Sequence, residues 1–183
     1  KAFVLAGSGN NGGDGYVIAR HLINSGISVT TYLIAERAKI KGDALINLKT
    51  LEKMNAPIAD ASDAKALRKL KKEFLNADLI IDALLGTGLD SEVKGILREA
   101  IELINSSGRP VCSVDIPSGL SADSGKPLGC AVKAHLTCTY GLKKVGQVIY
   151  PGVDYVGELE LVDISLPGDL IEGSNIPYRL GDE

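Results

Sequence analysis

The 183-residue chain contains no tryptophan, only two phenylalanines and six tyrosines. Proteins that bind single-stranded nucleic acid stack bases on aromatic side chains, so this composition disfavours that class. An excess of one charge sign is also missing, since 20 basic and 23 acidic residues leave a net charge of −3. Such a balance gives no general attraction to nucleic acid or to an anionic membrane surface. No apolar run approaches the length of about 18 residues that a membrane-spanning helix needs.

Cysteine and histidine are too few and too scattered for the common metal and disulfide frameworks. The three cysteines, Cys112, Cys130 and Cys138, form no C-x-x-C pair, which predicts free thiols in a reducing compartment. The two histidines, His21 and His135, lie far apart and disfavour a zinc site or a histidine-based triad. The chain opens directly on a strand-like run without a signal peptide, so we expect it to be cut from a longer protein. For a bacterial or archaeal parent we expect a cytoplasmic location.

Glycine is abundant, at 21 residues, and five glycines lie between Gly7 and Gly15. This cluster contains the G-x-G-x-x-G pattern between a strand-like run and a helical pattern, as in dinucleotide-binding turns. Without Cβ atoms the backbone N–H groups can approach phosphates, although a purely structural turn is the alternative. Three oxygen-bearing side chains among the glycines favour the binding interpretation: Asn10, Asn11 and Asp14. The cluster is not a P-loop, because no Gly-Lys-Ser/Thr follows.

Strand-like and helix-like segments alternate over the first two thirds of the chain. Apolar or β-branched runs predict strands at 2–6, 27–34, 78–85, 109–116, 134–140, 147–150 and 158–164. Helical spacing predicts helices from the glycine cluster to about residue 26, over 42–55 and 62–76, and through 96–104. This alternation predicts an α/β protein: a three-layer α/β/α domain with a mainly parallel, doubly wound sheet.

The run KALRKLKKEF within the third expected helix resembles a basic patch. Leu67, Leu70 and Phe74 nevertheless lie at the spacing of one apolar stripe, with Lys and Arg on the opposite side. We therefore expect a solvated helix face, not a nucleic-acid site.

Two aspartates end apolar strands, and each precedes a polar loop. Asp82 precedes the loop Gly86–Glu92, and Asp115 precedes a loop that contains Ser118. A carboxylate at such a position is costly unless it is paired, metal-bound or capping a turn. Because the carboxyl ends of parallel strands share one sheet edge, both loops should meet the glycine cluster there. The sequence thus predicts a site for a phosphate-bearing polar ligand, with oxygen ligands that suit a hard cation.

Four segments occur in an order that carries a family resemblance: GSGNNGGDGYVIAR, DALLGTGL, VDIPSGL and AVKAHLTCTYGLKKVGQVIYPG. Together they closely resemble the NAD(P)H-hydrate epimerase family, over residues 2–165. The resemblance implies a Rossmann-like α/β/α sandwich, commonly a homodimer. It also implies interconversion of the R and S forms of hydrated NADH and NADPH, which bear a hydroxyl at nicotinamide C6. A partner dehydratase that depends on ATP or ADP completes the repair.

The resemblance also implies site residues. Its substrate-binding positions match Asn10, Asn11, Gly12, Gly13, Asp14, Gly86, Thr87, Gly88, Leu89, Asp90, Ser91, Glu92 and Asp115. Its potassium ligands match Asn11, Asp82 and Ser118. Lys144 matches the lysine of a K-x-G element, and a surface ammonium without a role is the alternative. Epimerisation by loss and return of the C6 hydroxyl needs an acid and a base, and we hypothesise that Asp115 serves as both.

Residues 1–165 are expected to form the epimerase domain, and residues 166–183 a tail or linker toward a missing dehydratase domain. The segment Ile176–Gly181 resembles the linker of bifunctional members, whereas the helices that usually precede the first strand are missing. Two other functions stay open. In an NAD-dependent dehydrogenase, Glu36 would bind the ribose, and a non-catalytic nucleotide-binding protein would keep only the fold.

Overall fold

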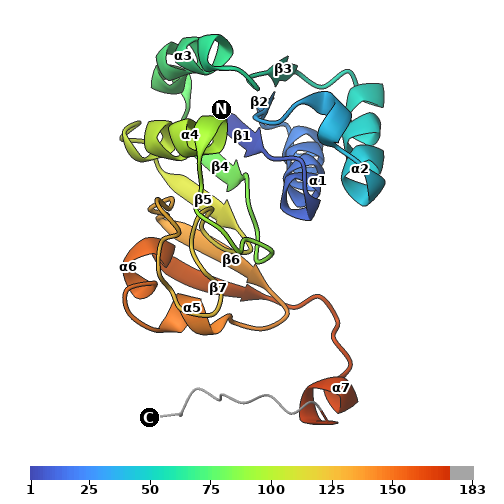
Figure 1. The fold of residues 1–183 in the computed structure, drawn as a ribbon. Coiled ribbons are helices and arrows are strands. Elements are labelled where there is room, and N and C mark those ends of the chain that lie inside the picture. Colours follow the sequence, from blue (N-terminus) through green and yellow to red (C-terminus); the bar gives the residue numbers. More distant parts are fainter. Residues whose placement is uncertain (174–183) are drawn as a thin grey trace.

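The computed structural model describes residues 1–173. Within this range a single seven-stranded sheet has the order β3-β2-β1-β4-β5-β6-β7, and all neighbouring strands are parallel (Figure 1). The strands are β1 (Ala2–Ala6), β2 (Val29–Leu33), β3 (Ile58–Asp60), β4 (Leu79–Ala83), β5 (Val111–Val114), β6 (Leu136–Tyr140) and β7 (Glu158–Val162). The predicted α/β class with a parallel, Rossmann-like sheet is confirmed.

Four longer helices cover the two faces of the sheet. They are α1 (Asn10–Asn24), α2 (Gly42–Lys53), α3 (Ala64–Glu73) and α4 (Gly95–Asn105). Short helical segments complete the described chain: η1 (Arg37–Lys39), η2 (Phe74–Asn76), α5 (Val145–Val148), α6 (Val153–Val156) and α7 (Gly168–Gly173). Figure 1 shows α1 and α2 on one face of the sheet, with α3 and α4 on the other.

The position of strand β1 between two layers of helices explains why its sequence is apolar at every position. Phe3 and Leu5 belong to the core cluster that includes residues of α3 and α4. Ala2, Val4 and Ala6 belong to the second cluster, with residues of α1 and α2. Side chains of a strand alternate between faces, so a strand with helices on both sides needs apolar residues throughout.

The prediction of a strand at residues 147–150 is wrong. Residues Val145–Val148 form helix α5 instead, and Tyr150 lies in the turn that follows. Val148 and Ile149 favour a strand by propensity, but tertiary contacts prevail. A Cβ on Gly146 would lie 2.1 Å from the Ser121 carbonyl oxygen, so this helix packs closely against the loop that contains Ser121.

Strand β3 was not predicted. It has only three residues at the sheet edge, which is too short for a recognisable period.

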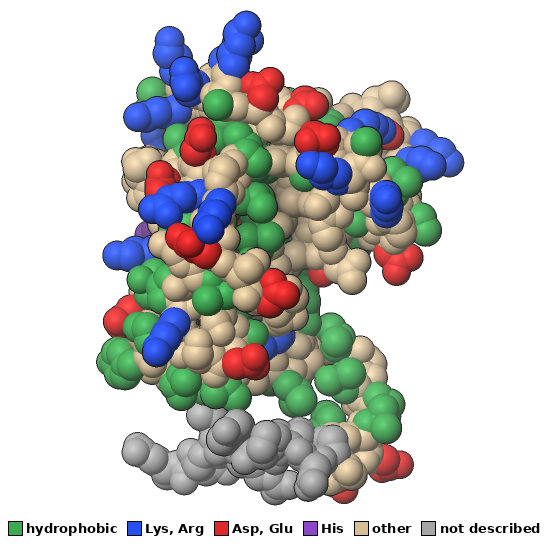
Figure 2. Space-filling view, in the orientation of Figure 1, with side chains coloured by type: hydrophobic (Ala, Val, Ile, Leu, Met, Phe, Trp, Pro, Cys, Tyr) green, Lys and Arg blue, Asp and Glu red, His purple; other side chains and the backbone are tan. Residues whose placement is uncertain are grey.

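The basic run on α3 forms a solvated face, as expected. Leu67, Leu70 and Phe74 are buried, whereas the Lys and Arg side chains of α3 are exposed. Figure 2 shows these blue side chains gathered over α3, at the top of the molecule. In the part of the chain described here, no helix combines the length and the apolar character needed to cross a membrane. The linker-like segment Ile176–Gly181 lies outside the described residues.

Several glycines of the cluster lie inside helix α1 and let it pack closely on the sheet. A Cβ on Gly12 would lie 2.1 Å from the Gly7 carbonyl oxygen, and one on Gly15 would lie 2.6 Å from Ala83 Cβ. Real Cβ atoms do not approach so closely, so both positions require glycine. The close packing fixes where the N-terminus of α1 meets the ends of β1 and β4.

We predict that Gly15→Ala destabilises the fold by about 1–3 kcal/mol, because the added methyl group meets the Cβ of Ala83. Alanine favours helices over glycine, so a loss of stability reports the clash and not helix propensity. Denaturant unfolding measures it, with Gly88→Ala as the control, since nothing lies within 4 Å of a Cβ there. Equal unfolding midpoints for the two variants would contradict the packing argument.

Candidate functional site

A pocket of about 670 Å³ lies at the carboxyl ends of β1, β2 and β4. The loop Gly7–Gly9 and the first turns of α1 line one side, and the loop Leu84–Leu89 lines the other. In this strand order the chain leaves β1 and β4 in opposite directions, and such a switch point is where open α/β sheets bind ligands. The volume lies within the usual range of small-molecule sites.

The N-terminus of α1 opens into this pocket. Gly9 is its N-cap residue, and no side chain caps the helix there. The first backbone N–H groups of a helix have no partner within the helix and carry partial positive charge. They therefore suit an anionic group such as a phosphate.

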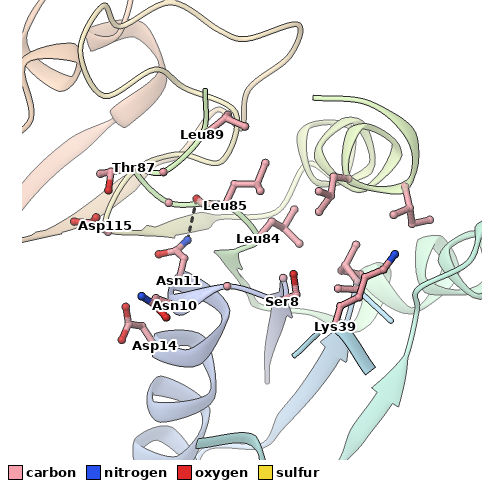
Figure 3. A pocket seen from close by; sticks show the side chains of 18 of the residues that line it. Ser8, Asn10, Asn11, Asp14, Lys39, Leu84, Leu85, Thr87, Leu89 and Asp115 are labelled. Atoms are coloured by element: carbon pink, nitrogen blue, oxygen red, sulfur yellow. Dashed lines mark hydrogen bonds between the residues drawn. The ribbon is translucent and has the colours of Figure 1, made fainter. Parts of the chain in front are cut away.

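The backbone of Leu85 joins all three predicted loops. Its carbonyl oxygen accepts a hydrogen bond from Asn11 Nδ2 at 2.9 Å, drawn as a dashed line in Figure 3. Its N–H donates to Ser118 Oγ at 2.8 Å. The other amide atom of that asparagine, Asn11 Oδ1, is buried and has no hydrogen-bond partner among the described residues. Leaving a buried oxygen without a partner costs free energy, so this atom is a candidate to bind a ligand or a cation.

Asp82 is fully buried behind this junction. Its Oδ2 accepts hydrogen bonds from Ser113 Oγ at 2.8 Å and from the Ser118 N–H at 2.9 Å. Its Oδ1 accepts from Ser118 Oγ at 2.6 Å and from the Leu84 N–H at 3.3 Å. All of these donors are neutral, and burial raises the pKa of the Asp82 carboxyl. A nearby cation would offset the cost of the buried charge.

Asp115 follows β5 with a backbone φ of +65°, the left-handed region that few residues other than glycine adopt. Its N–H donates to the Cys138 carbonyl oxygen at 2.8 Å. Its own carbonyl oxygen accepts from Gln147 Nε2 at 2.7 Å. Such a conformation costs on the order of 1–3 kcal/mol and persists only where its surroundings hold it, as these two bonds do.

The carboxylate of Asp115 is held at one oxygen only. Oδ1 accepts hydrogen bonds from Lys144 Nζ and from the Tyr140 N–H, the latter at 3.1 Å. Lys144 also donates to Thr139 Oγ1 at 2.8 Å, so this ammonium is fixed and is not a free surface group. Within the described chain no hydrogen bond reaches Asp115 Oδ2, and Asp115 lines the pocket.

Asp14 lies at the same end of the pocket. Figure 3 shows it below Asn10, on the side of the pocket where Asp115 lies. Burial and the neighbouring Asp115 carboxylate raise the pKa of Asp14. This end therefore combines a lysine-bound carboxylate with a second carboxyl that keeps its proton more readily.

Comparisons with known proteins agree with this geometry. Residues 1–146 match the family model described as YjeF-related protein N-terminus. A protein of Pirellula staleyi named NAD(P)H-hydrate epimerase is 37% identical over 94% of this chain and 76% of its own length. The chain belongs to the NAD(P)H-hydrate epimerase family. This confirms the resemblance and supports the epimerase interpretation over an NAD-dependent dehydrogenase.

Longer relatives in this epimerase family carry two functions. A Thermofilum pendens protein named bifunctional NAD(P)H-hydrate repair enzyme Nnr is 41% identical over all of this chain. The chain spans about a third of the length of such bifunctional relatives, 34% in this case. A crystal structure of yeast ynu0, YNL200c, shares the fold with a TM-score of 0.73 at 24% identity, over 99% of this chain and 74% of that one.

The structure brings most of the positions that we expect to bind substrate to one pocket. Eight of them line it: Asn10, Asn11, Asp14, Gly86, Thr87, Gly88, Leu89 and Asp115. Gly12 and Gly13 lie behind the lining, packed against the Gly7 carbonyl and Ala44. Asp90, Ser91 and Glu92 are exposed and lie outside the lining. A role in substrate binding stays a prediction for all thirteen positions, the eight that line the pocket included.

Sequence reasoning missed two groups of residues. Gln147, which holds Asp115, lay in the segment wrongly expected to be a strand. The far end of the pocket is lined by residues after β2 and β3 and on α4, among them Lys39, Ser62 and Leu97. The one sequence feature that pointed to this end of the pocket was Glu36, placed after the second strand. Glu36 also lines the pocket.

We predict that Asp82→Asn lowers the free energy of unfolding by about 1–3 kcal/mol. The backbone N–H groups of Leu84 and Ser118 each point at a different carboxylate oxygen, so the asparagine NH₂ would face a donor in either orientation. Thermal or denaturant unfolding measures the loss, with the exposed Asp90→Asn as the control. An Asp82→Asn protein as stable as the control would show that this network does not hold the loops together.

Proposed function

We propose that this chain interconverts the R and S forms of hydrated NADH and NADPH at nicotinamide C6, as the names of its epimerase relatives suggest. The observation that carries the proposal is the arrangement of Asp115. One of its oxygens binds Lys144, and the other accepts no hydrogen bond from the described residues. Asp115 lies at a pocket whose phosphate-compatible helix N-terminus suits a dinucleotide.

The reaction needs proton transfer but no hydride acceptor. The C6 carbon bears both N1 and the hydroxyl, so the N1 lone pair forms a C=N bond as the C6–O bond breaks. An acid protonates the departing oxygen to give water, and a base takes a proton from the water that adds to the opposite face. Asp115 performs both transfers, and Lys144 holds it in position. Asp14, with its raised pKa, supplies a second proton-carrying group beside it.

Potassium fits the residues that hold the three loops together. Asn11 Oδ1 offers a buried oxygen that has no partner in the described part of the chain, and the Ser118 hydroxyl and the buried Asp82 carboxylate belong to the same network. Oxygen ligands of this kind suit a large, hard cation. When bound, potassium would supply the positive charge that offsets the buried Asp82 carboxylate. The chain's own residues then hold the phosphates on α1 and the C6 hydroxyl at Asp115.

A longer parent protein extends this proposal. The coverage of bifunctional relatives suggests that the epimerase unit is joined to a dehydratase that uses ATP or ADP. A homodimer rests on the family resemblance, and a cytoplasmic location rests on a bacterial or archaeal origin of the parent protein. A non-catalytic nucleotide-binding protein is the competing function, and the activity of the purified chain separates the two.

We predict that Asp115→Asn lowers the rate of epimerisation by a factor of about 10²–10⁴ at saturating substrate and potassium, because an amide cannot exchange the proton. The rate is measured from the approach of separated R and S hydrates to equilibrium. Asp123→Asn, an exposed aspartate outside the pocket, is the matched control. A near-normal rate for Asp115→Asn would remove Asp115 from the chemistry.

We predict that potassium raises the free energy of unfolding by about 1.4 kcal/mol at ten times its Kd, compared with tetramethylammonium at equal ionic strength. Asn11→Ala should lose this increase, because it removes the buried oxygen. Asn10→Ala, its exposed neighbour, should keep it. Equal stabilisation of all three proteins by both cations would contradict a potassium site at Asn11.

A further inference from the structure

The pocket extends beyond the carboxylates that the proposed chemistry uses. Figure 3 shows Asp14 and Asp115 at one side and Lys39 at the opposite side, with Ser8 between them. A hydrated nicotinamide at the Asp115 end would leave the far end to the other half of the dinucleotide.

The walls of the far end are apolar. Buried Ile34 and partly buried Ala35 follow β2, and partly buried Ile96 and Leu97 face them from α4. Leu84 continues this surface toward the middle of the pocket. Apolar walls of this kind suit the faces of a purine base, although no aromatic ring lines the pocket within the described residues.

Polar groups stand beside this apolar surface. Glu36 lies three residues after the end of β2 and forms an ion pair with Lys39 at 2.8 Å. Ser62, after β3, donates its hydroxyl to Asp60 at 2.6 Å. In folds with this strand order, an acidic residue at the end of the second strand binds the hydroxyls of the adenosine ribose. Glu36 occupies that position in this chain.

The charges that line the pocket favour hydrated NADH over hydrated NADPH, which carries an additional 2′-phosphate. Among the residues that line the pocket, Asp14, Glu36 and Asp115 are acidic and Lys39 is the one basic residue, already paired with Glu36. Arg37, next in the chain, pairs with Glu52. No unpaired cation in the described lining would receive a 2′-phosphate, and Glu36 would repel it.

We propose that the far end of the pocket is an adenosine subsite in which Glu36 accepts the ribose 2′-hydroxyl and so selects hydrated NADH over hydrated NADPH. The choice between these two substrates rests on the proposed epimerase function. The subsite itself requires only that the pocket bind the ADP-ribose half of the dinucleotide, so the two can be tested apart.

The subsite is tested with ADP-ribose and 2′-phospho-ADP-ribose, which contain the adenosine half and lack nicotinamide. In isothermal titration calorimetry, the unmodified chain should bind ADP-ribose at least about tenfold more tightly than 2′-phospho-ADP-ribose. ADP-ribose gains a charged hydrogen bond to Glu36, whereas the 2′-phosphate is repelled by the same carboxylate. Glu36→Gln should bring the ratio near one. Glu102→Gln, an exposed carboxylate on α4 outside the pocket lining, should leave the ratio unchanged.

Kinetics extend the test to the whole substrate. The ratio of kcat/KM for hydrated NADH and hydrated NADPH should fall with Glu36→Gln, mainly through KM, because Glu36 lies far from the reacting carbon. A chain that binds ADP-ribose with this discrimination yet fails to epimerise either hydrate overturns the proposed function and supports the subsite. An active chain whose ratios do not respond to Glu36→Gln, or one that does not bind ADP-ribose, overturns the subsite.

Discussion

The buried carboxylate of Asp82 fixes the loops that build the site. It accepts hydrogen bonds from Ser113 on β5 and from Ser118 in the loop beyond it, and so ties the end of β4 to the next strand. Ser118 continues the network to the Leu85 backbone, which receives the side chain of Asn11 from α1. Three segments that lie far apart in the sequence therefore share one set of hydrogen bonds. Burying a charge to join these segments costs free energy. The carboxylate accepts hydrogen bonds from particular directions and so sets the positions of the three segments.

The pocket beside this junction has two ends of different character. At one end, the left-handed backbone at Asp115 and the bonds from Lys144 and Gln147 leave one carboxylate oxygen without a hydrogen bond from residues 1–173. At the other end, apolar side chains after β2 and on α4 lie beside the Glu36–Lys39 ion pair. The uncapped N-terminus of α1 lies between them. The order of these features follows the order in which a dinucleotide presents its nicotinamide, phosphates and adenosine.

The sequence predicted what depends on local pattern. Alternating segments predicted the parallel sheet, and aspartates at strand ends predicted that Asp82 and Asp115 lie at one sheet edge. It could not distinguish glycines that approach a ligand from Gly12 and Gly15, which pack against the sheet, because both need the Cβ to be absent. It also missed Gln147, because strand propensity at residues 147–150 conceals a helix that tertiary packing imposes. The far end of the pocket depends on contacts between distant elements that no local period records.

The most direct test of this account is the equilibration of separated R and S hydrated NADH with the purified chain, followed by the signals of the two C6 epimers. The account predicts that catalytic amounts of the chain, with potassium present, bring either pure epimer to the equilibrium mixture much faster than the spontaneous reaction, without consuming the hydrate. Equilibration at the spontaneous rate, by a chain shown to be folded and to bind ADP-ribose, would contradict it.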